Sequence, residues 1–235
     1  MLIEGKNAIH EALKSERTVE TLLVEKGMNH QIISIARQQG VKVQFVEKSV
    51  LDKKTGSKKH QGFVAEVSDF QYSTVEEILA NKKGENNFIV ICDGVEDPHN
   101  LGSILRVCEC AGVDGVIIGK NRQVFVNDTV SRCSAGAVQH VKVAKVTNLT
   151  RTIEQLKQEG VWVYCADMDG TEIYSTNLKG NVALVIGGEG KGVSRLVKEN
   201  CDGVLSLPLF GQVNSLNASV ACGIVVYEVV RQRQN

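Results

Sequence analysis

The fold and the ligand site of this chain are decided by the stretch LVIGGEGKG, residues 184–192. An apolar run followed at once by four glycines in six residues is typical of a buried strand that opens into a glycine loop. Glycine is needed where the backbone takes a positive φ or lets a ligand come close to its N–H groups. A tight turn is the competing interpretation, since glycine clusters mark turns more often than sites. The loop alone leaves both interpretations open.

The stretch LPLFGQVNSLNAS, residues 207–219, continues this region with the end of a second strand, a loop and the start of a helix. Asn214, Ser215, Asn217 and Ser219 gather at that helix start. Ser215 is either the N-cap of the helix or a site residue, whereas Asn217, inside the first turn, has less to gain from capping. No Gly-x-Ser-x-Gly motif surrounds Ser215, which disfavours a hydrolase nucleophile.

The glycine loop fits neither of the two common phosphate-binding templates. Gly-x-x-x-x-Gly-Lys-Ser/Thr is absent. Gly-x-Gly-x-x-Gly does not fit either: counted from Gly187 its second glycine would fall on Glu189, and counted from Gly188 its last glycine would fall on Val193. An ATPase and a dinucleotide-dependent oxidoreductase are therefore disfavoured. The charge of Glu189 also repels phosphate, so a cationic or neutral ligand suits this loop better.

A third loop of interest, DGVEDPHNLGSILR at residues 93–106, follows the apolar run 88–92. Asn100 stands where a helix N-cap belongs, and Arg106 follows about one and a half turns later, so both could serve one site. Arg106 interrupts an apolar helix, and its charge must reach solvent or an anion. Phosphate is the natural anion, because guanidinium binds it in a bidentate fork. His99 could act as a general base, although no partner for it is evident from the sequence.

Composition sets the broad class of the protein. The chain has 235 residues, 43% hydrophobic and 23% charged, with a formal net charge of zero, so we expect two domains and any nucleic-acid contact through a local patch. Seven cysteines without a Cys-x-x-Cys pair disfavour a zinc or other metal site and fit a reducing, cytoplasmic setting. The first residues lack a signal-peptide pattern, and no apolar stretch is long enough to span a membrane.

The periodicity of the chain predicts a small α/β unit over residues 1–68, a polar linker with one capped helix over 69–87, and a second domain over 88–235. In the first unit we expect helices near 8–13 and 30–39 and strands at 21–24, 41–45 and 63–67. The second domain alternates strands with helices, which predicts a mostly parallel sheet covered on both faces, with ligands at the carboxyl ends of its strands. Its expected strands are 88–92, 116–118, 141–146, 161–166, 182–186 and 204–207, and its expected helices are 101–111, 128–132, 149–159, 193–199 and 215–231.

One basic segment stands out in the first unit. Lys53 and Lys54 precede a Thr-Gly-Ser tip, and Lys58 and Lys59 follow it. These four positive charges could contact RNA phosphates. Charge alone favours a solvated loop.

Taken together, DPHNLGSILR (97–106), GGEGKG (187–192) and SLNAS (215–219) resemble, in that order, the three motifs of the SpoU (TrmH-like) family of RNA ribose 2′-O-methyltransferases. The resemblance covers the second domain. GKNA (5–8) and HQG (60–62) are similar to the small substrate-binding domain that precedes it in bacterial members, and residues 127–138 resemble the family's middle region. The branch that methylates a guanosine of 23S rRNA is the most similar. Two positions depart from the pattern: Gly188 stands where serine or alanine is commoner, and Ala218 where valine is expected.

The resemblance implies an α/β fold with a deep trefoil knot in the parallel-sheet domain, preceded by a ribosomal-protein-like RNA-binding domain. It implies RNA as the substrate, S-adenosylmethionine as the cofactor and a homodimer whose sites draw on both chains. The cofactor contacts that it implies are Gly187, Gly188, Glu189, Gly190, Leu207 and Leu216. The catalytic positions that it implies are Arg106, Asn100, Glu189, Ser215 and Asn217, and the RNA contacts are Lys58, Lys59 and Arg106.

The reaction implied by the resemblance is the attack of a ribose 2′-hydroxyl on the cofactor methyl group. Orientation of the two reactants alone can supply roughly 7 to 11 kcal/mol of the barrier. In the family, the residue that matches Arg106 is proposed to take the hydroxyl proton. Because arginine stays charged in proteins, a phosphate clamp that polarises the hydroxyl is an alternative role. A tRNA substrate and a non-catalytic RNA-binding or ribosome-assembly protein also stay open.

Overall fold

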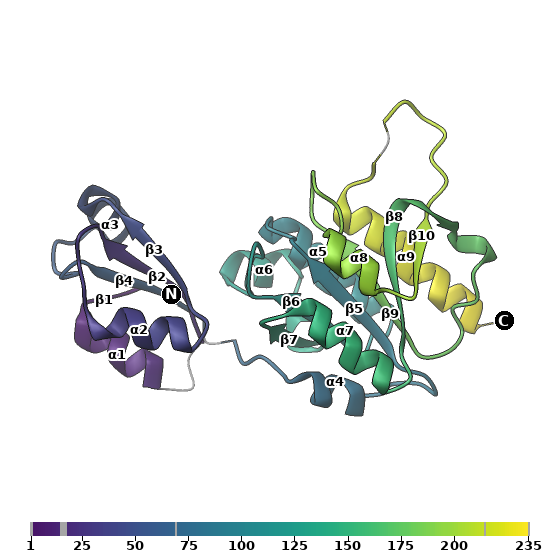
Figure 1. Cartoon of the computed structure of the whole chain (residues 1–235), viewed down its shortest axis with the longest axis horizontal. Coiled ribbons are helices and arrows are strands. Elements are labelled where there is room, and N and C mark those ends of the chain that lie inside the picture. Colours follow the sequence, from purple (N-terminus) through teal and green to yellow (C-terminus); the bar gives the residue numbers. More distant parts are fainter. Residues whose placement is uncertain (1, 15–17, 69, 214, 235) are drawn as a thin grey trace. The chain divides into compact units, whose positions relative to one another are not determined.

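The chain forms two compact units, residues 1–71 and 72–235 (Figure 1). The structure, a computed structural model, describes residues 2–14, 18–68, 70–213 and 215–234. Asn214, one of the polar residues expected at the last helix start, lies outside the described residues. Each unit has its own hydrophobic core, and each is described by itself below.

The first unit is a four-stranded mixed sheet with the strand order β1-β4-β2-β3. β2 pairs parallel with β3 and antiparallel with β4, and β1 adds an antiparallel edge. The elements are β1 (Leu2–Glu4), α1 (Lys6–Lys14), β2 (Thr18–Glu25), α2 (Gln31–Gln38), β3 (Lys42–Val46), α3 (Lys48–Thr55) and β4 (Phe63–Ser68).

Alternation along β2 divides the core of this unit between the two faces of the sheet. Leu22 and Val24 pack with the apolar stripes of α1 and α2, whereas Leu23 packs with Leu51 of α3. The expected helices and strands of this unit are confirmed, but α3 and β1 were not expected. Lys53 and Lys54 therefore lie at the end of a helix and not in a loop.

The second unit is a six-stranded parallel sheet with the order β10-β8-β9-β5-β6-β7. The α/β fold with a mostly parallel sheet is thus as predicted, while the trefoil knot stays a prediction. The elements are α4 (Val75–Ala80), β5 (Phe88–Asp93), α5 (Pro98–Cys110), β6 (Gly115–Gly119), α6 (Asp128–Cys133), η1 (Ala137–Gln139), β7 (Lys142–Val146), α7 (Leu149–Gln158), β8 (Trp162–Glu172), η2 (Ile173–Ser175), β9 (Val182–Gly187), α8 (Arg195–Asn200), β10 (Gly203–Ser206) and α9 (Ala218–Arg233).

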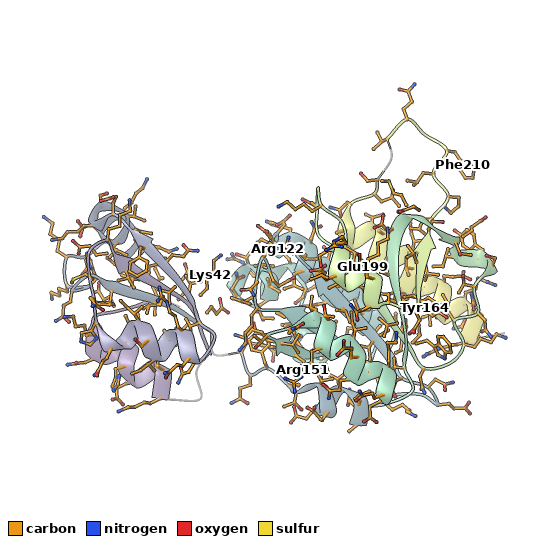
Figure 2. The ribbon with its side chains drawn as sticks, viewed as in Figure 1. Lys42, Arg122, Arg151, Tyr164, Glu199 and Phe210 are labelled. Atoms are coloured by element: carbon orange, nitrogen blue, oxygen red, sulfur yellow. The ribbon has the colours of Figure 1, made fainter. Side chains whose placement is uncertain are left out.

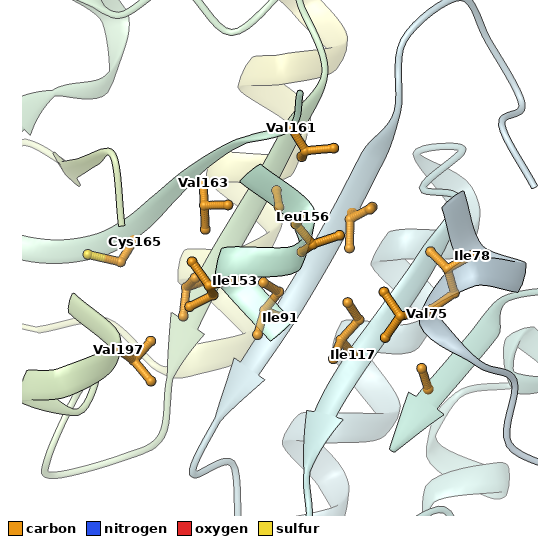
Figure 3. Packing of buried hydrophobic residues seen from close by; sticks show 14 of the residues in the cluster. Val75, Ile78, Ile91, Ile117, Ile153, Leu156, Val161, Val163, Cys165 and Val197 are labelled. Atoms are coloured by element: carbon orange, nitrogen blue, oxygen red, sulfur yellow. The ribbon is translucent and has the colours of Figure 1, made fainter. Parts of the chain in front are cut away.

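Helices cover both faces of this sheet. Figure 3 shows Ile153 and Leu156 of α7, Val75 and Ile78 of α4, and Val197 of α8 packed on one face. α5 and α9 lie together on the other face (Figure 1). β5 and β9 are the central strands and read as continuous apolar runs because both of their faces are buried. α4 belongs to this core although it lies in the segment predicted as a linker, and its Thr74–Glu77 capping box is as expected.

Two helix starts differ from the expected ones. α5 begins at Pro98 with Asp97 as its N-cap, because the Asp97 side chain accepts a hydrogen bond from the N–H of His99. α9 begins at Ala218 with Asn217 as its N-cap. The cap role, one of two alternatives left open for Asn100 and for Ser215, therefore belongs to Asp97 and Asn217. Proline is favoured at the first helical position, so Pro98 in the sequence already indicated the start of α5.

In the described part of the chain, none of the helices combines the length and apolar character that a membrane crossing requires. The same residues contain no group of three or more His, Cys, Asp or Glu side chains arranged to hold a metal ion.

Candidate functional site

Three loops of the second unit meet at the carboxyl ends of parallel strands. They follow β5, β9 and β10. Strands of a parallel sheet all end at one edge, so these loops form one continuous site. All three were expected to carry the site. β8, which lies between β9 and β10 in the sheet, adds Asp167 and Met168 to the first cavity described below, and this contribution was not expected.

A hydrogen-bonded cluster of three side chains joins these loops. The Asn100 amide Nδ2 donates to Glu189 Oε1 at 2.6 Å, and Asn217 Nδ2 donates to the same oxygen at 3.1 Å and to Asn100 Oδ1 at 2.9 Å. Asn100 is buried, whereas Glu189 and Asn217 are exposed. One carboxylate oxygen is thus held by two amides, in the strong class of hydrogen bonds to a charged acceptor.

Each member of this cluster is fixed by its own element. Asn100 lies in the first turn of α5, and Glu189 lies in the glycine loop that follows β9. Asn217 Oδ1 accepts hydrogen bonds from the N–H groups of Ser219 and Val220, so capping of α9 turns its amide nitrogen toward Asn100. Asn217 therefore serves as a cap and as a member of the cluster.

The glycine loop is anchored by Asp93, a residue that the sequence analysis did not single out. The Asp93 carboxylate accepts from the N–H of Ser194 at 2.6 Å, and its carbonyl accepts from the N–H of Gly188 at 2.8 Å. A Cβ atom at Gly187 would stand 2.2 Å from the carbonyl carbon of Gly192, and one at Gly188 would stand 1.8 Å from the carbonyl oxygen of Gly94. Glycine at both positions is therefore required by close backbone packing, which also accounts for Gly188 where the family more often has serine or alanine.

A cavity of about 600 Å³ lies beside this loop. Residues 187–192 line it together with Leu207, Leu209 and Leu216, and Asp167 and Met168 of β8 line it too. Ser215 and Asn217 complete the lining. All the residues expected to contact a cofactor, Gly187, Gly188, Glu189, Gly190, Leu207 and Leu216, line this cavity. It is an apolar slot with exposed backbone and a carboxylate at its rim, which suits a ligand with a flat apolar part and a positive charge.

The carboxylates near the cavity differ in their hydrogen-bond and ion-pair partners. Lys198 Nζ lies 3.0 Å from Asp167 Oδ2 and 2.9 Å from Asp169 Oδ1. The hydrogen bond from Lys198 lowers the pKa of Asp169, and the bond to Asp169, with Asp167 as a further partner, raises the pKa of Lys198. The Glu189 carboxylate, in contrast, has the side-chain amides of Asn100 and Asn217 as hydrogen-bond partners.

A second cavity, of about 460 Å³, shares the glycine loop with the first. It is lined by Glu96, Asp97 and Arg122 and by the Asn100 and Glu189 side chains. Gly188, Glu189, Lys191, Gly192 and Ala218 line both cavities. The Asn100–Glu189–Asn217 cluster therefore lies between the two spaces, where a group held in one could meet a group held in the other.

The remaining expected site residues lie apart from this cluster. Arg106 is an exposed residue of α5 that lines neither cavity, and Ser215 lines the first cavity as an exposed residue of the loop before α9. Lys58 and Lys59 are exposed residues of the first unit. In the same loop as Ser215, the Phe210 side chain is 97% exposed, and Figure 2 shows it on the segment that extends from the second unit.

His99, the other candidate from the sequence, does have a partner. Its Nδ1 lies 3.2 Å from Sγ of Cys133 in α6. This contact links α5 to α6, and Gly102 makes the approach possible because a Cβ atom there would stand 2.5 Å from Cys133 Cβ.

Comparison with known proteins gives a single answer for both units. Residues 87–227 match the model of the SpoU rRNA Methylase family, and residues 2–73 match the model described as RNA 2′-O ribose methyltransferase substrate binding. YacO of Bacillus subtilis (strain 168), assigned to the TrmH family of tRNA/rRNA methyltransferases, is 45% identical over 97% of this chain and 94% of its own length. A Staphylococcus aureus (strain COL) relative with the same assignment is 41% identical over 100% of this chain and 97% of its own.

Solved structures agree on the fold. The SpoU methyltransferase AviRb from Streptomyces viridochromogenes, in complex with the cofactor AdoMet, has a TM-score of 0.65 at 22% identity and covers 100% of this chain and 90% of its own. The TrmH/SpoU tRNA modifying enzyme of A. aeolicus has a TM-score of 0.59 at 28% identity and covers 67% of this chain and 80% of its own. The predicted fold class is confirmed by these likenesses.

Proposed function

The chain belongs to the TrmH/SpoU family of RNA 2′-O-ribose methyltransferases, and from that premise we propose that it methylates the ribose 2′-hydroxyl of a guanosine in 23S rRNA, with S-adenosylmethionine as the methyl donor. The observation that carries the proposal is the Asn100–Glu189–Asn217 cluster between two adjoining cavities. A group transfer needs two reactants held close together and correctly oriented. Two adjoining cavities with the cluster between them suit this requirement.

The first cavity fits the cofactor. Its backbone wall can accept and donate hydrogen bonds to an adenine edge and to an amino-acid group, and its leucines can enclose the flat base. Gly187, Gly188, Gly190, Leu207 and Leu216 are the residues proposed to hold it. When bound, S-adenosylmethionine supplies a methyl group on a cationic sulfur, and the Glu189 carboxylate at the rim favours that charge.

The residues of this chain then act on the hydroxyl and on the geometry. Asn100 and Asn217 fix Glu189 by hydrogen bonds of 2.6 and 3.1 Å, so the rim of the cofactor cavity keeps one shape before substrate arrives. Ser215 lies on the same rim and is proposed to orient the ribose. Such fixed positions lower the barrier because little reorganisation is needed when the reactants meet.

Arg106 is proposed to act in a homodimer, from the chain opposite. In its own chain it lines neither cavity, yet it lies on α5, next to α9, whose surface exposes apolar residues one helical turn apart. Val220, Ile224 and Tyr227 on that face are 50%, 39% and 49% exposed, a pattern typical of a protein–protein contact. Across such a contact Arg106 would reach the partner's ribose site and bind an RNA phosphate beside the hydroxyl.

Mixing two inactive variants tests this arrangement. Chains with Arg106→Ala and chains with Glu189→Gln are each expected to be inactive, whereas a mixture that exchanges subunits should recover up to about a quarter of the normal activity, because each mixed dimer keeps one complete site. Recovery requires that Arg106 and Glu189 of one site come from different chains. A mixture that stays inactive, while sedimentation shows mixed dimers, would place Arg106 in its own chain's site.

The role of the guanidinium is tested by Arg106→Lys. Single-turnover rates across pH are expected to stay low at every pH, since lysine cannot form the bidentate fork. Near-normal rates at high pH would instead indicate that a positive charge or a proton acceptor suffices.

We favour ribosomal RNA as the substrate because residues 2–73 match the substrate-binding model, and an additional RNA-binding domain suits a large structured RNA. Transfer RNA is the rival, since the relatives' assignment covers both RNA classes and the A. aeolicus neighbour modifies tRNA. We propose that Lys58 and Lys59 of this unit contact RNA phosphates. We propose a cytoplasmic location, because the seven cysteines form no disulfide and thiols stay reduced in the cytoplasm.

One experiment decides the substrate. The protein is incubated with S-adenosylmethionine carrying a labelled methyl group and with separated 23S rRNA, 16S rRNA and tRNA, and the labelled ribose is mapped. Label in a 23S rRNA guanosine is expected. Label in tRNA alone would show that tRNA, and not 23S rRNA, is the substrate. Failure to bind S-adenosylmethionine in calorimetry would favour a non-catalytic RNA-binding protein.

A further inference from the structure

The second cavity contains polar groups that the transfer step described above does not use. Glu96 and Arg122 both line it, and in the part of the chain that the structure describes neither side chain makes a hydrogen bond or an ion pair. Asp97 lines it too, with one carboxylate oxygen engaged as the cap of α5. At about 460 Å³ the space is of the size that encloses a small ligand.

The loop that carries Arg122 is tied to the loop that carries Glu96. The N–H of Val95 donates to Gln123 Oε1 at 3.0 Å, and the N–H of Val124 donates to the carbonyl of Val95 at 2.9 Å. Arg122 itself has a φ of +50°, a conformation that costs about 1 kcal/mol for a residue with a side chain. The two loops that carry these exposed residues are therefore tied to each other beside the cavity.

Charges of opposite sign at one cavity select among the nucleobases. Guanine alone has two adjacent N–H donors, N1–H and N2–H₂, next to the acceptors O6 and N7. A carboxylate accepts from the two donors, and a guanidinium donates to the two acceptors. Adenine and cytosine would turn a ring nitrogen acceptor toward the carboxylate, and uracil has one N–H between two carbonyls.

We infer that this cavity holds the guanine of the target nucleotide, with Glu96 accepting from N1–H and N2–H₂ and Arg122 donating to O6 and N7. The inference rests on the proposed function for the position of the ribose. A base in this cavity places its ribose at the wall formed by Asn100 and Glu189, facing the cofactor cavity. The target nucleotide is then turned out of its RNA stack, as enzymes that read single bases require.

Binding of free nucleotides tests the inference without any methyl transfer. Saturation-transfer NMR is measured with GMP, IMP, AMP, CMP and UMP, each at the same concentration. GMP is expected to give the strongest signal, and IMP, which lacks the N2 amino group, a signal at least fivefold weaker. Glu96→Gln and Arg122→Ala should remove the preference for GMP. Glu85→Gln and Arg151→Ala, matched changes at exposed residues that line neither cavity, should keep it.

Methyl transfer provides the second readout. On the mapped RNA with guanosine at the target, Glu96→Gln is expected to lower kcat/KM by about tenfold to a hundredfold, and on the same RNA with inosine the loss should be smaller, because inosine keeps N1–H but lacks the N2 amino group. Equal signals from all five nucleotides, or an unchanged guanosine-to-inosine ratio in Glu96→Gln, would overturn the inference while leaving the methyltransferase function in place. A GMP preference that depends on Glu96, in a protein that methylates no RNA, would support the cavity assignment and overturn the proposed function.

Discussion

Substitution of Gly187 by alanine probes the contact on which the cofactor cavity depends. A Cβ atom at this position would stand 2.2 Å from the carbonyl carbon of Gly192 and 2.4 Å from the backbone nitrogen of Val193. Contacts of a Cβ shorter than 3.0 Å essentially do not occur, so the two backbone segments must separate by at least 0.8 Å (3.0 minus 2.2). Backbone cannot give way as a side-chain tip can, and the whole glycine loop has to move.

The cost follows from the size of this movement. Overpacking of a well-packed interior destabilises proteins by about 1 to 3 kcal/mol, and a backbone clash belongs at the upper end. For a chain of this length, 3 kcal/mol corresponds to a decrease in Tm of roughly 6 to 12 °C. Because the displaced loop lines the cofactor cavity, we expect the Kd for S-adenosylmethionine to rise about tenfold, or about 1.4 kcal/mol.

Thermal unfolding and calorimetry with S-adenosylmethionine measure both effects. Gly180→Ala is the matched control, since a Cβ atom there has no neighbour within 4 Å and Gly180 lines neither cavity. If Gly187→Ala has the Tm and the Kd of this control, the close contact of residues 187 and 192 does not shape the site, and the reasoning is wrong.

Three further predictions concern single residues of the second unit. Asp114→Ala should lower the free energy of unfolding more than Asp114→Asn, at about 1 to 3 kcal/mol for each donor left unpaired, because the buried carboxylate accepts from two backbone N–H groups at 2.8 and 2.7 Å; equal Tm values would contradict this. Asn217→Ala should cost about 1 kcal/mol of stability through the lost cap of α9, and a loss of methyl transfer beyond that of Asn148→Ala, which removes the side-chain cap of α7 away from both cavities, would confirm its second role. The hydrogen bonds from Arg231 lower the pKa of the buried Glu228, so this carboxylate stabilises the fold above its unfolded pKa of about 4.5 and loses that effect as pH falls through its folded pKa. The difference in unfolding free energy between wild type and Glu228→Gln should therefore be larger at pH 7 than at pH 3.5, and a difference independent of pH would contradict it.

Much of the fold could be predicted because its signals are local. The runs at residues 88–92 and 182–186 are apolar throughout, and such strands fit only the interior of a parallel sheet. The glycine loop after the second run and the polar residues near 100 and 217 were found for the same reason, since each directly follows a strand or begins a helix. The three family motifs then linked these loops to one reaction.

Roles inside the site could not be predicted from neighbours along the chain. Asn100 and Asn217 have the same chemistry, yet one is a first-turn residue buried against Glu189 and the other caps its helix. Their hydrogen bonds span 89, 117 and 28 positions of sequence. A preference for capping depends on the local backbone, whereas these contacts exist because β5 lies beside β9 and α5 packs against α9.

The sequence by itself determined the strands, the glycine loop, the family and the set of candidate residues. Only the tertiary structure decided that Asp97 and Asn217 are the caps, that Asp93 anchors the glycine loop and that Arg106 lies away from its own chain's cluster. It also revealed a second cavity that has Glu96 and Arg122 among its lining residues. The physical reason is that propensity and periodicity act over a few residues, while a site is assembled from loops that the parallel sheet brings to one edge.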